Sequence, residues 1–573
     1  MSDYLAHLNP SQRKAVEKTE GPLMVIAGAG SGKTRVLTYR IAHLLHKGVD
    51  PFNVLSLTFT NKAAKEMKER IEKIIGTAAK NIWMGTFHSV FAKILRFEAD
   101  KLGYPSNFTI YDSDDSKALL RRIIKEMSLD KDIYKVNIVA SRISSFKNNL
   151  ITVKAYNNNT ELKTQDDSAH RPQMGVIYEN YVKECFKSGA MDFDDLLLKT
   201  NELIFRFPEV LHKYQERFKY ILVDEYQDTN HSQYLIVKAL ASRFENLCVV
   251  GDDAQSIYAF RGANIRNILN FKKDYADSKI IKLEQNYRST QNIVKAANSI
   301  ISKNTEQLDK KVWTANDLGE KIKVNRAMTD NDEAAMVSSN IQETKNREQA
   351  LNEDFAILYR TNSQSRSMEE SLRKRGLPYR IYGGVSFYQR KEIKDLMAYF
   401  RIASNTQDEE AIRRIINYPK RGIGNSSIDR ITLRAKEQQK SFWEVIKNIK
   451  TEESGLNAGS TTKVDDFTIL IKSFQALAKE QDAYEVASYI AKQSGLFKEM
   501  QTDKTPEGIS RYENLQELLN GLKDFVDQEN QKPEDERNSS LSYYLEDIAL
   551  FTENDKEDKD NGDHVSLMTI HQS

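Results

Sequence analysis

The first hundred residues alternate between short apolar runs and stretches in which apolar residues recur at helical spacing. The run at 23–26, LMVI, is apolar at every position, which is typical of a strand buried on both faces of a parallel sheet. Helical spacing of apolar residues begins soon afterwards, at 35–37. Strand–helix repeats of this kind over residues 1–107 predict an α/β fold, in which helices cover a parallel sheet.

Two long helical stretches interrupt this α/β pattern. The first contains predicted helices at 117–127, 136–148 and 174–186. Strands at 279–283, 355–359 and 565–570 indicate a second α/β domain, which the other helical stretch interrupts. The predicted organisation is a first α/β domain (1–107 and 190–278), its helical insertion (108–189), a second α/β domain (279–378 and 563–573) and its helical insertion (379–562).

Composition limits the class of protein without identifying its chemistry. At 573 residues the chain is too long for a single core, and about four domains are expected. Lys plus Arg number 84 and Asp plus Glu 82, so a surface for nucleic acid would have to be a local patch. Two distant cysteines, Cys185 and Cys248, predict no disulfide framework and fit a reducing compartment. Because no apolar run has membrane length and no secretory signal is found, we predict a cytoplasmic protein without a membrane partner.

The turn between the first strand and the helix after it is rich in glycine. It comprises Ala27, Gly28, Ala29, Gly30, Ser31, Gly32, Lys33 and Thr34, and Arg35 follows. Glycines allow backbone N–H groups to face phosphate oxygens, and the helix N-terminus adds its positive dipole end. Lys33 would then reach the β- and γ-phosphates, and the Thr34 hydroxyl would ligate Mg²⁺. A turn without function is the alternative, because the strict pattern has glycine in place of Ala27, but Gly-Lys-Thr after a strand favours a nucleotide site.

An acidic element that could complete the nucleotide chemistry follows the apolar strand at 220–223. Its first residues are Asp224 and Glu225. One carboxylate of such a pair can hold Mg²⁺, and its neighbour can accept a proton from the attacking water. We assign the metal to Asp224 and the role of general base to Glu225. Alone, the pair would equally suit a solvated turn, but combined with the Lys33 segment it predicts hydrolysis of a nucleoside triphosphate.

Five further blocks carry a resemblance to a known family. They are LNPSQ at 8–12, TFTNKAA at 58–64, GTFHS at 85–89, VVGDDAQSIY at 249–258 and QNYRS at 285–289. With the glycine-rich turn and the acidic pair they make seven blocks in order, and the chain resembles the UvrD/Rep/PcrA family of superfamily 1 DNA helicases. The resemblance extends over essentially the whole chain, and this family tolerates alanine at the position of Ala27.

The resemblance implies two RecA-like motor domains, each with a helical insertion, and ATP-dependent unwinding of DNA in the 3′-to-5′ direction. It implies that Gln12 and Tyr287 contact the adenine of ATP. It also implies that Gln255 couples the γ-phosphate to DNA and that Arg288 reaches the nucleotide from the second motor domain.

A set of residues is expected on single-stranded DNA by the same resemblance. Its members are Phe59, Asn61, Thr86, His88, Tyr258, Phe260 and Arg261. Tyr258 and Phe260 lie two residues apart, hence on one side of an extended chain, where both can stack on bases. The family usually has Trp in place of Phe260, so stacking there is expected to be weaker. Core packing is the alternative for each aromatic, and for His88 the two interpretations are evenly balanced.

Another DNA candidate lies in the second insertion, where residues 419–427 read PKRGIGNSS and resemble a helix-hairpin turn. Backbone N–H groups around Gly422 and Gly424, with Lys420 beside them, suit a phosphate of duplex DNA. An ordinary turn between helices is the competing interpretation, and the family context favours duplex contact.

The last block, 564–573, resembles the start of a family motif whose continuation is absent, as is a later arginine motif. We therefore expect a fragment of a longer helicase, in which Arg288 lacks a second arginine on the γ-phosphate. The predicted enzyme is an ATP- and Mg²⁺-dependent 3′-to-5′ DNA helicase of repair or replication, cytoplasmic and nucleoid-associated. Its partners would be single-stranded DNA, single-strand/duplex junctions and accessory proteins. The alternatives are the ATPase subunit of a recombination helicase–nuclease and a DNA-binding scaffold with a silent motor.

Overall fold

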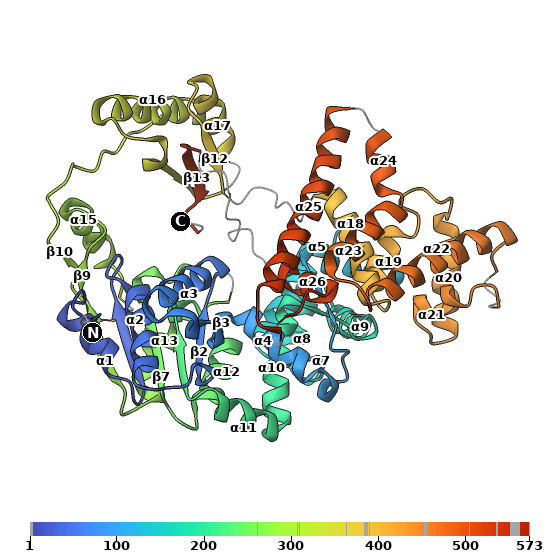
Figure 1. Ribbon diagram of the computed structural model, residues 1–573, viewed down its shortest axis with the longest axis horizontal. Coiled ribbons are helices and arrows are strands. Elements are labelled where there is room, and N and C mark those ends of the chain that lie inside the picture. The colour runs from blue at the N-terminus through green and yellow to red at the C-terminus, as the bar shows by residue number, and fades with distance from the viewer. Residues whose placement is uncertain are drawn as a thin grey trace. The chain divides into compact units, whose positions relative to one another are not determined.

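The computed structural model describes most of the chain, in two compact units. It covers residues 4–571 apart from 260–261, 306, 309, 362–363, 383–387, 389, 452–454, 503–504, 535–536 and 550–561. The first unit comprises Met1–Val90, Asn201–Gly384 and Thr552–Ser573, and we call it the sheet unit. The second comprises Phe91–Thr200 and Val385–Phe551, and we call it the helical unit (Figure 1).

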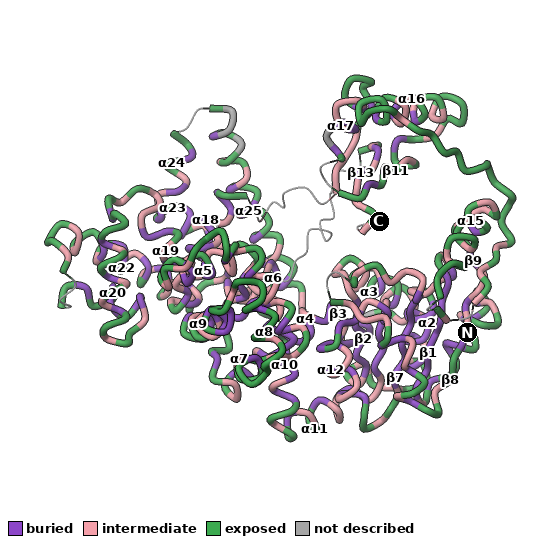
Figure 2. Tube along the Cα trace, turned by 180° about the vertical axis from the view of Figure 1, so that it is seen from behind, coloured by how far each residue is buried: buried purple, intermediate pink, exposed green. Residues whose placement is uncertain are grey.

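The sheet unit is built around six strands, all paired in parallel. They are β1 (Leu23–Ala27), β2 (Val54–Thr58), β3 (Trp83–Thr86), β6 (Tyr220–Val223), β7 (Leu247–Gly251) and β8 (Lys279–Leu283), in the order β3-β2-β6-β7-β1-β8. β1, β2 and β7 are buried at every position, as their apolar runs predict, and Figure 2 shows these strands in purple. The predicted α/β fold is confirmed.

Helices accompany the strands of the sheet unit. Those that lie wholly within it are α1 (Pro10–Glu17), α2 (Lys33–His46), α3 (Asn61–Ile75), α11 (Pro208–Arg217), α12 (His231–Ala241), α13 (Arg266–Leu269), α14 (Phe271–Asp274), α15 (Gln291–Ile301), α16 (Asp330–Glu348) and α17 (Ser365–Lys374). The core of the six-stranded sheet joins side chains of β1 and α2, such as Val25 and Leu37, which are both fully buried.

The strand at 279–283 does not begin the second α/β domain, as the sequence analysis expected. It is β8, and it pairs with β1 along its whole length, from Leu23 opposite Lys279 to Ala27 opposite Leu283. Ile281 and Leu283 are buried in the core of the first sheet, which explains the pairing. The first sheet therefore extends through Leu283, five residues beyond the predicted boundary at 278.

A second, smaller α/β part follows. Its strands β11 (Ala356–Tyr359), β12 (Tyr379–Ile381) and β13 (Val565–Thr569) pair in parallel in the order β11-β13-β12. β13 thus lies between two strands that precede it by about two hundred residues of sequence. Figure 1 shows β12 and β13 side by side. The predicted strands at 355–359 and 565–570 are confirmed. A short pair, β9 (Gln285–Asn286) and β10 (Trp313–Thr314), connects the two parts.

The helical unit combines both insertions, which the sequence analysis treated as separate domains, and it also includes residues 91–107 and 190–200. Strands β4 (Thr109–Tyr111) and β5 (Ala190–Asp192) pair in parallel at the two ends of the first insertion. The helices of the first insertion are α5 (Ser113–Glu126), α6 (Val136–Asn148), α7 (Val153–Asn157), α8 (Thr160–Ser168) and α9 (Met174–Lys187). α5, α6 and α9 correspond to the three helices predicted there. On either side of the insertion, α4 (Phe87–Phe97) and α10 (Phe193–Arg206) each include residues of both units.

The second insertion is helical in its described part from Lys391 onward. Its helices are α18 (Lys391–Ser404), α19 (Glu409–Ile415), α20 (Asn425–Glu437), α21 (Phe442–Lys447), α22 (Ala458–Leu477), α23 (Ala483–Gln493), α24 (Leu496–Thr502), α25 (Pro506–Asn530) and α26 (Leu541–Ala549). Residues 379–381, which were predicted to begin this insertion, instead form β12 and pair with β13 in the sheet unit. α18 is the central helix of this insertion, and its Tyr399 and Phe400 are fully buried in the core.

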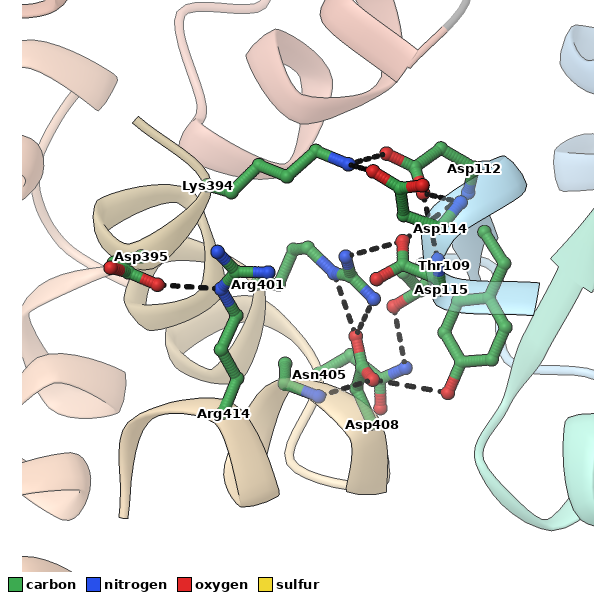
Figure 3. A network of polar contacts seen from close by, with 12 residues as sticks. Thr109, Asp112, Asp114, Asp115, Lys394, Asp395, Arg401, Asn405, Asp408 and Arg414 are labelled. Atoms are coloured by element: carbon green, nitrogen blue, oxygen red, sulfur yellow. Dashed lines mark hydrogen bonds and ion pairs between the residues drawn. The ribbon is translucent and has the colours of Figure 1, made fainter. Parts of the chain in front are cut away.

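Ion pairs join the two insertions inside the helical unit (Figure 3). The Arg401 guanidinium of α18 lies 2.8 Å from Asp115 of α5 and 2.7 Å from Asp408. The Lys394 ammonium, about two turns earlier on α18, lies 2.9 Å from Asp112. Asn405 donates a hydrogen bond to Thr109 at 3.1 Å. Segments far apart in sequence are therefore held together by charged and polar contacts.

Both cysteines are buried and free, and Cys248 lies inside β7, where it packs in the core as predicted. In the part of the chain that the structure describes, no helix has the length and apolar character needed to span a bilayer.

Candidate nucleotide and DNA site

The glycine-rich loop between β1 and α2 is closely approached by other parts of the chain. Gly30 and Gly32 have φ values of +65° and +87°, in the left-handed region that favours glycine. A Cβ atom on Gly30 would lie 2.7 Å from the Asn286 amide nitrogen, and one on Gly28 would lie 2.6 Å from Val312. The Ser31 hydroxyl donates to the Gly28 carbonyl at 2.6 Å and closes the loop. Side chains are therefore excluded where backbone N–H groups must approach a phosphate.

Three residues predicted to be catalytic meet at the start of α2. The Lys33 ammonium lies 2.6 Å from Glu225 Oε2 and 3.3 Å from Gln255 Oε1. The other end of the Gln255 amide donates to Asp252 Oδ2 at 2.6 Å. Thr34, the predicted metal ligand on this helix, is the second residue of α2 and is half-buried.

Glu225 is held in an unusual backbone conformation directly after β6. Its φ of +47° lies in the left-handed region, which is uncommon for residues other than glycine and is often found at functional sites. Gln227 donates to Glu225 Oε2 at 2.8 Å and accepts the backbone N–H of Asp252 at 2.9 Å. Gln227 thus connects the ends of β6 and β7. Gln227 stands in the same acidic segment, but this role was not predicted from the sequence.

Two carboxylates beside Glu225 are short of positive charge. Burial, reinforced by the negative charge of Glu225, raises the pKa of Asp224 to about 7, although Lys33 opposes the shift. The same causes raise the pKa of Asp228 to about 7. Asp228 Oδ1 is buried without a hydrogen-bond partner, and Asp224 forms no ion pair with a lysine or arginine of the described chain. A buried carboxylate without a lysine or arginine partner, such as Asp224, suits a divalent cation.

Mg²⁺ typically takes one or two protein carboxylates and completes its shell with water and substrate phosphates. Among the described residues, no cluster of three or more His, Cys, Asp or Glu side chains forms a metal site by itself. Asp224 and the Thr34 hydroxyl therefore fit a magnesium ion that arrives with a nucleotide, rather than a metal caged by protein ligands alone.

The predicted adenine residues lie beside the loop. The Gln12 side chain is 2% exposed, and its amide donates to the Ser31 carbonyl at 2.9 Å. Asn9, at the start of α1, donates to the Tyr287 hydroxyl at 2.7 Å. The structure thus brings Gln12 and Tyr287 to the same loop, with the Gln12 amide bound to its backbone. Arg35 is exposed on α2, and its guanidinium lies over the Tyr39 ring.

The segment containing Tyr287 and Arg288 is hydrogen-bonded to the loop through its backbone and through Asn286. The Asn286 amide donates to the Ala29 carbonyl at 2.7 Å, and the Tyr287 N–H donates to the Gly30 carbonyl at 2.9 Å. Arg288 is exposed, and its backbone N–H is bound by Asn286 at 2.9 Å. Asn286 lies within the block at 285–289, but its contact with the loop was not predicted from the sequence.

Two strand ends present residues predicted to contact single-stranded DNA. Phe59 follows β2, and its ring lies 5.4 Å from that of Phe87, which follows the neighbouring strand β3. Thr86 is buried and accepts the Ser89 N–H at 3.2 Å, so it caps the turn into α4. Burial lowers the pKa of His88 to about 4, which keeps its ring neutral near pH 7. Asn61 begins α3 at the same edge of the sheet.

The other single-strand candidates follow β7. The Tyr258 hydroxyl donates to the His571 backbone carbonyl, and the two rings meet edge to face at 5.8 Å. Tyr258 therefore contacts the segment that follows β13. Phe260 and Arg261 lie outside the described residues.

The Gly-Ile-Gly turn of the helical unit has a rigid base and an exposed edge. The Asn417 side chain accepts the N–H groups of Arg421 at 3.1 Å and Ile423 at 3.0 Å. Lys420, Gly422 and Gly424 are exposed, and Gly424 caps the N-terminus of α20. The turn presents backbone N–H groups and a cation on one exposed edge.

Two known protein-family domains together match almost the whole chain. The sequence matches the UvrD/REP helicase N-terminal domain over residues 8–276 and the UvrD-like helicase C-terminal domain over residues 281–573. The chain belongs to the UvrD/REP helicase family.

Individual relatives agree with the family. The chain is 44% identical to the ATP-dependent DNA helicase PcrA of Staphylococcus aureus over 575 residues, which span 100% of this chain and 76% of the relative. The identity and coverage are the same for the PcrA helicase of Staphylococcus epidermidis. The predicted UvrD/REP resemblance is confirmed, and the protein is an enzyme, an ATP-dependent DNA helicase.

Proposed function

We propose that this UvrD/REP helicase hydrolyses Mg²⁺–ATP at the Lys33–Glu225 centre and uses that energy to move 3′-to-5′ along single-stranded DNA and to unwind the duplex ahead. The observation that carries the proposal is the convergence of the Lys33 ammonium, the Glu225 carboxylate and the Gln255 amide within hydrogen-bond distance. These groups come from the ends of three different elements, as a site for cleaving a phosphoanhydride requires.

Glu225 acts as the general base. It accepts a proton from the water that attacks the γ-phosphorus, while the bond to the bridging oxygen breaks and releases ADP and phosphate. Without nucleotide, Lys33 neutralises Glu225 by direct contact at 2.6 Å. When phosphates enter the loop, Lys33 turns to them and leaves Glu225 available for its proton.

Asp224 and Thr34 would hold Mg²⁺, which, when bound, neutralises charge that develops on the phosphate oxygens. Asp224 would give up its proton to hold the metal, because a divalent cation beside it would oppose the burial and the Glu225 charge that raise its pKa. Gln12 and Tyr287 frame the adenine beside the loop, and Arg288 turns from its exposed position toward the phosphates.

The DNA path crosses the carboxyl edge of the six-stranded sheet. Phe59 and Tyr258 supply aromatic surfaces for bases, and Asn61, Thr86 and His88 supply neutral polar groups at the same strand ends. Phe260 and Arg261 would extend this path. In the helical unit, Lys420, Gly422 and Gly424 bind a phosphate of the duplex. We place the enzyme in the cytoplasm, at the nucleoid, with accessory repair or replication proteins as partners.

ATP turnover with and without single-stranded DNA tests the motor, and unwinding of duplexes with 3′ or 5′ tails tests its direction. DNA should stimulate turnover, and only the 3′-tailed duplex should be unwound. Lys33→Ala should abolish both activities, whereas Lys73→Ala, an exposed lysine of α3, should not. A rate of ATP hydrolysis that single-stranded DNA does not increase would instead favour the scaffold with a silent motor. Unwinding of the 5′-tailed duplex would contradict the proposed 3′-to-5′ direction.

A further inference from the structure

Lys310 forms a buried ion pair with two aspartates at the end of β7. Its ammonium lies 2.7 Å from Asp252 Oδ1 and also contacts Asp253, with side chains that are 6%, 2% and 0% exposed, respectively. The backbone N–H of Leu308 donates to Asp253 Oδ2 at 2.9 Å. Burial disfavours the lysine charge, but the two carboxylates outweigh it and raise the pKa of Lys310. The Lys310 side chain is therefore positively charged and is held between the carboxylates of Asp252 and Asp253.

Asp252 connects Lys310 to the nucleotide site. Its Oδ1 accepts from Lys310, while its Oδ2 accepts the Gln255 amide at 2.6 Å. The opposite end of that amide faces the Lys33 ammonium at 3.3 Å. An amide can present its oxygen to Lys33 only while its nitrogen is turned the other way, toward Asp252. The orientation of Gln255 thus depends on a carboxylate that Lys310 holds in place.

The two ends of this polar chain belong to different halves of the protein. Asp252 and Gln255 lie in the region that matches the N-terminal helicase domain, and Lys310 lies in the region that matches the C-terminal one. Lys310 stands between α15 and β10, 57 residues after Asp253. A displacement of its segment would withdraw the cation from Asp252 and release the Gln255 amide.

We propose that Lys310 is a positioning residue that transmits the placement of the C-terminal domain to Gln255 through Asp252. The inference rests on the proposed function, because Gln255 matters only if the site hydrolyses ATP. With Lys310 in contact, the buried Asp252 carboxylate has a cation beside the Ala254 N–H that Oδ1 also accepts at 3.1 Å, and Gln255 faces the phosphate site. Without it, two buried carboxylates lack a cation, and Asp252 is pulled away from Gln255 toward water.

Lys310→Met tests this role, because methionine has a similar length and no charge. DNA-stimulated kcat should fall by about 10- to 100-fold, since a misplaced group near the reaction costs that much. The KM for ATP should stay within about twofold, because Lys310 does not contact the phosphate loop. Lys310→Arg, which keeps the charge, should recover part of the loss. Lys311→Ala is the matched control, an exposed neighbour, and should behave like the wild type.

A double variant separates positioning from general damage to the fold. If Lys310 acts through Asp252, then combining Lys310→Met with Asp252→Asn should cost no more than the larger single loss. Losses in kcat that multiply would overturn the inference, as would a Lys310→Met variant with normal kcat or with a change in KM alone. If Lys310→Met does not fold, Lys310→Gln takes its place with the same expected loss. If DNA does not increase the rate of ATP hydrolysis by the wild type, the proposed function itself is contradicted.

Discussion

The sheet unit and the helical unit both bury groups of carboxylates, but they compensate the charge differently. In the helical unit, the arginines and lysines of the chain do so, as Arg401 does for Asp115 and Asp408. In the sheet unit, Lys33 is the cation in contact with Glu225, while Asp224 and Asp228 beside it have raised pKa values. The first arrangement is complete without a ligand, whereas the second lacks a positive charge that Mg²⁺ with a nucleotide would provide.

Burial alone does not separate the two cases. Burial also raises the pKa of Asp115, to about 6, although Arg401 opposes the shift. What distinguishes the nucleotide site is the combination of a missing cation, an unpaired buried oxygen on Asp228 and the left-handed backbone of Glu225. Strain and uncompensated charge are costs that a purely structural site avoids, so their coincidence indicates function.

The largest expected effect is on turnover, from Glu225→Gln. The amide cannot accept the proton of the attacking water, so DNA-stimulated kcat should fall by about 10²- to 10⁴-fold while ATP still binds. Thermal stability should hold or rise, because removing the charge relieves Asp224 and Asp228. Turnover and nucleotide affinity are measured on the same preparation. Normal turnover in this variant would exclude Glu225 as the base.

The helical unit should respond in the opposite way. Arg401→Met leaves Asp115 and Asp408 buried without their shared cation, which should lower the free energy of unfolding by about 3–5 kcal/mol. Nucleotide binding to the sheet unit should not change. The control is Arg430→Met, which removes an exposed arginine of the same unit and should cost less than about 0.5 kcal/mol. Equal losses in the two variants, measured by thermal unfolding, would show that the buried pairs contribute little.

Asp224→Asn tests whether the buried Asp224 carboxylate lacks compensation, because it should change how stability depends on pH. In the wild type the folded pKa of Asp224 is about 7 against an ordinary 3.8, so between these values unfolding releases a proton and stability falls as pH rises. Asparagine does not titrate, so the variant should gain stability over the wild type across this window and keep the gain above it. The gain is at most about 4 kcal/mol, because one pKa unit corresponds to about 1.4 kcal/mol.

Thermal unfolding at about pH 5 and about pH 8, without Mg²⁺ or nucleotide, measures this difference. Parallel behaviour of wild type and variant would mean that Asp224 is already compensated. Mg²⁺–ATP should stabilise the wild type more than the variant, because only the carboxylate gains a cation.

Local sequence was sufficient to predict the parts of the nucleotide site that lie next to strands. The run at 23–26 followed by Gly-Lys-Thr predicted both the strand and the loop, because backbone conformation and phosphate chemistry share the same few residues. Lys33, Glu225 and Gln255 meet as expected. Asn286 and Gln227 were missed although their blocks were recognised, since their hydrogen bonds to backbone groups depend on the tertiary fold.

Long-range features were harder to predict for the same reason. Nothing near Lys310 in sequence distinguishes it from Lys311, and only the fold brings it to Asp252. The strand at 279–283 was assigned to the wrong sheet, because an apolar run does not specify its neighbour. The union of the two insertions depends on pairs such as Arg401 with Asp115, which are 286 residues apart.

The smallest expected effect concerns the exposed edge of the helical unit, where the charge of Lys420 faces solvent instead of a buried carboxylate. Lys420 is exposed beside a turn that Asn417 fixes, whereas Arg421 next to it is turned inward and donates to the Ser494 carbonyl at 2.9 Å. Lys420→Ala should therefore remove one phosphate contact on a single-strand/duplex junction without loosening the turn. The salt slope of junction binding should become shallower by about 0.9, the value for one phosphate neutralised.

Lys479→Ala is the matched control, an exposed lysine at the far end of α22, and should leave the slope unchanged. Dissociation constants over a salt series measure both, and equal slopes for wild type and Lys420→Ala would remove this turn from the duplex contact.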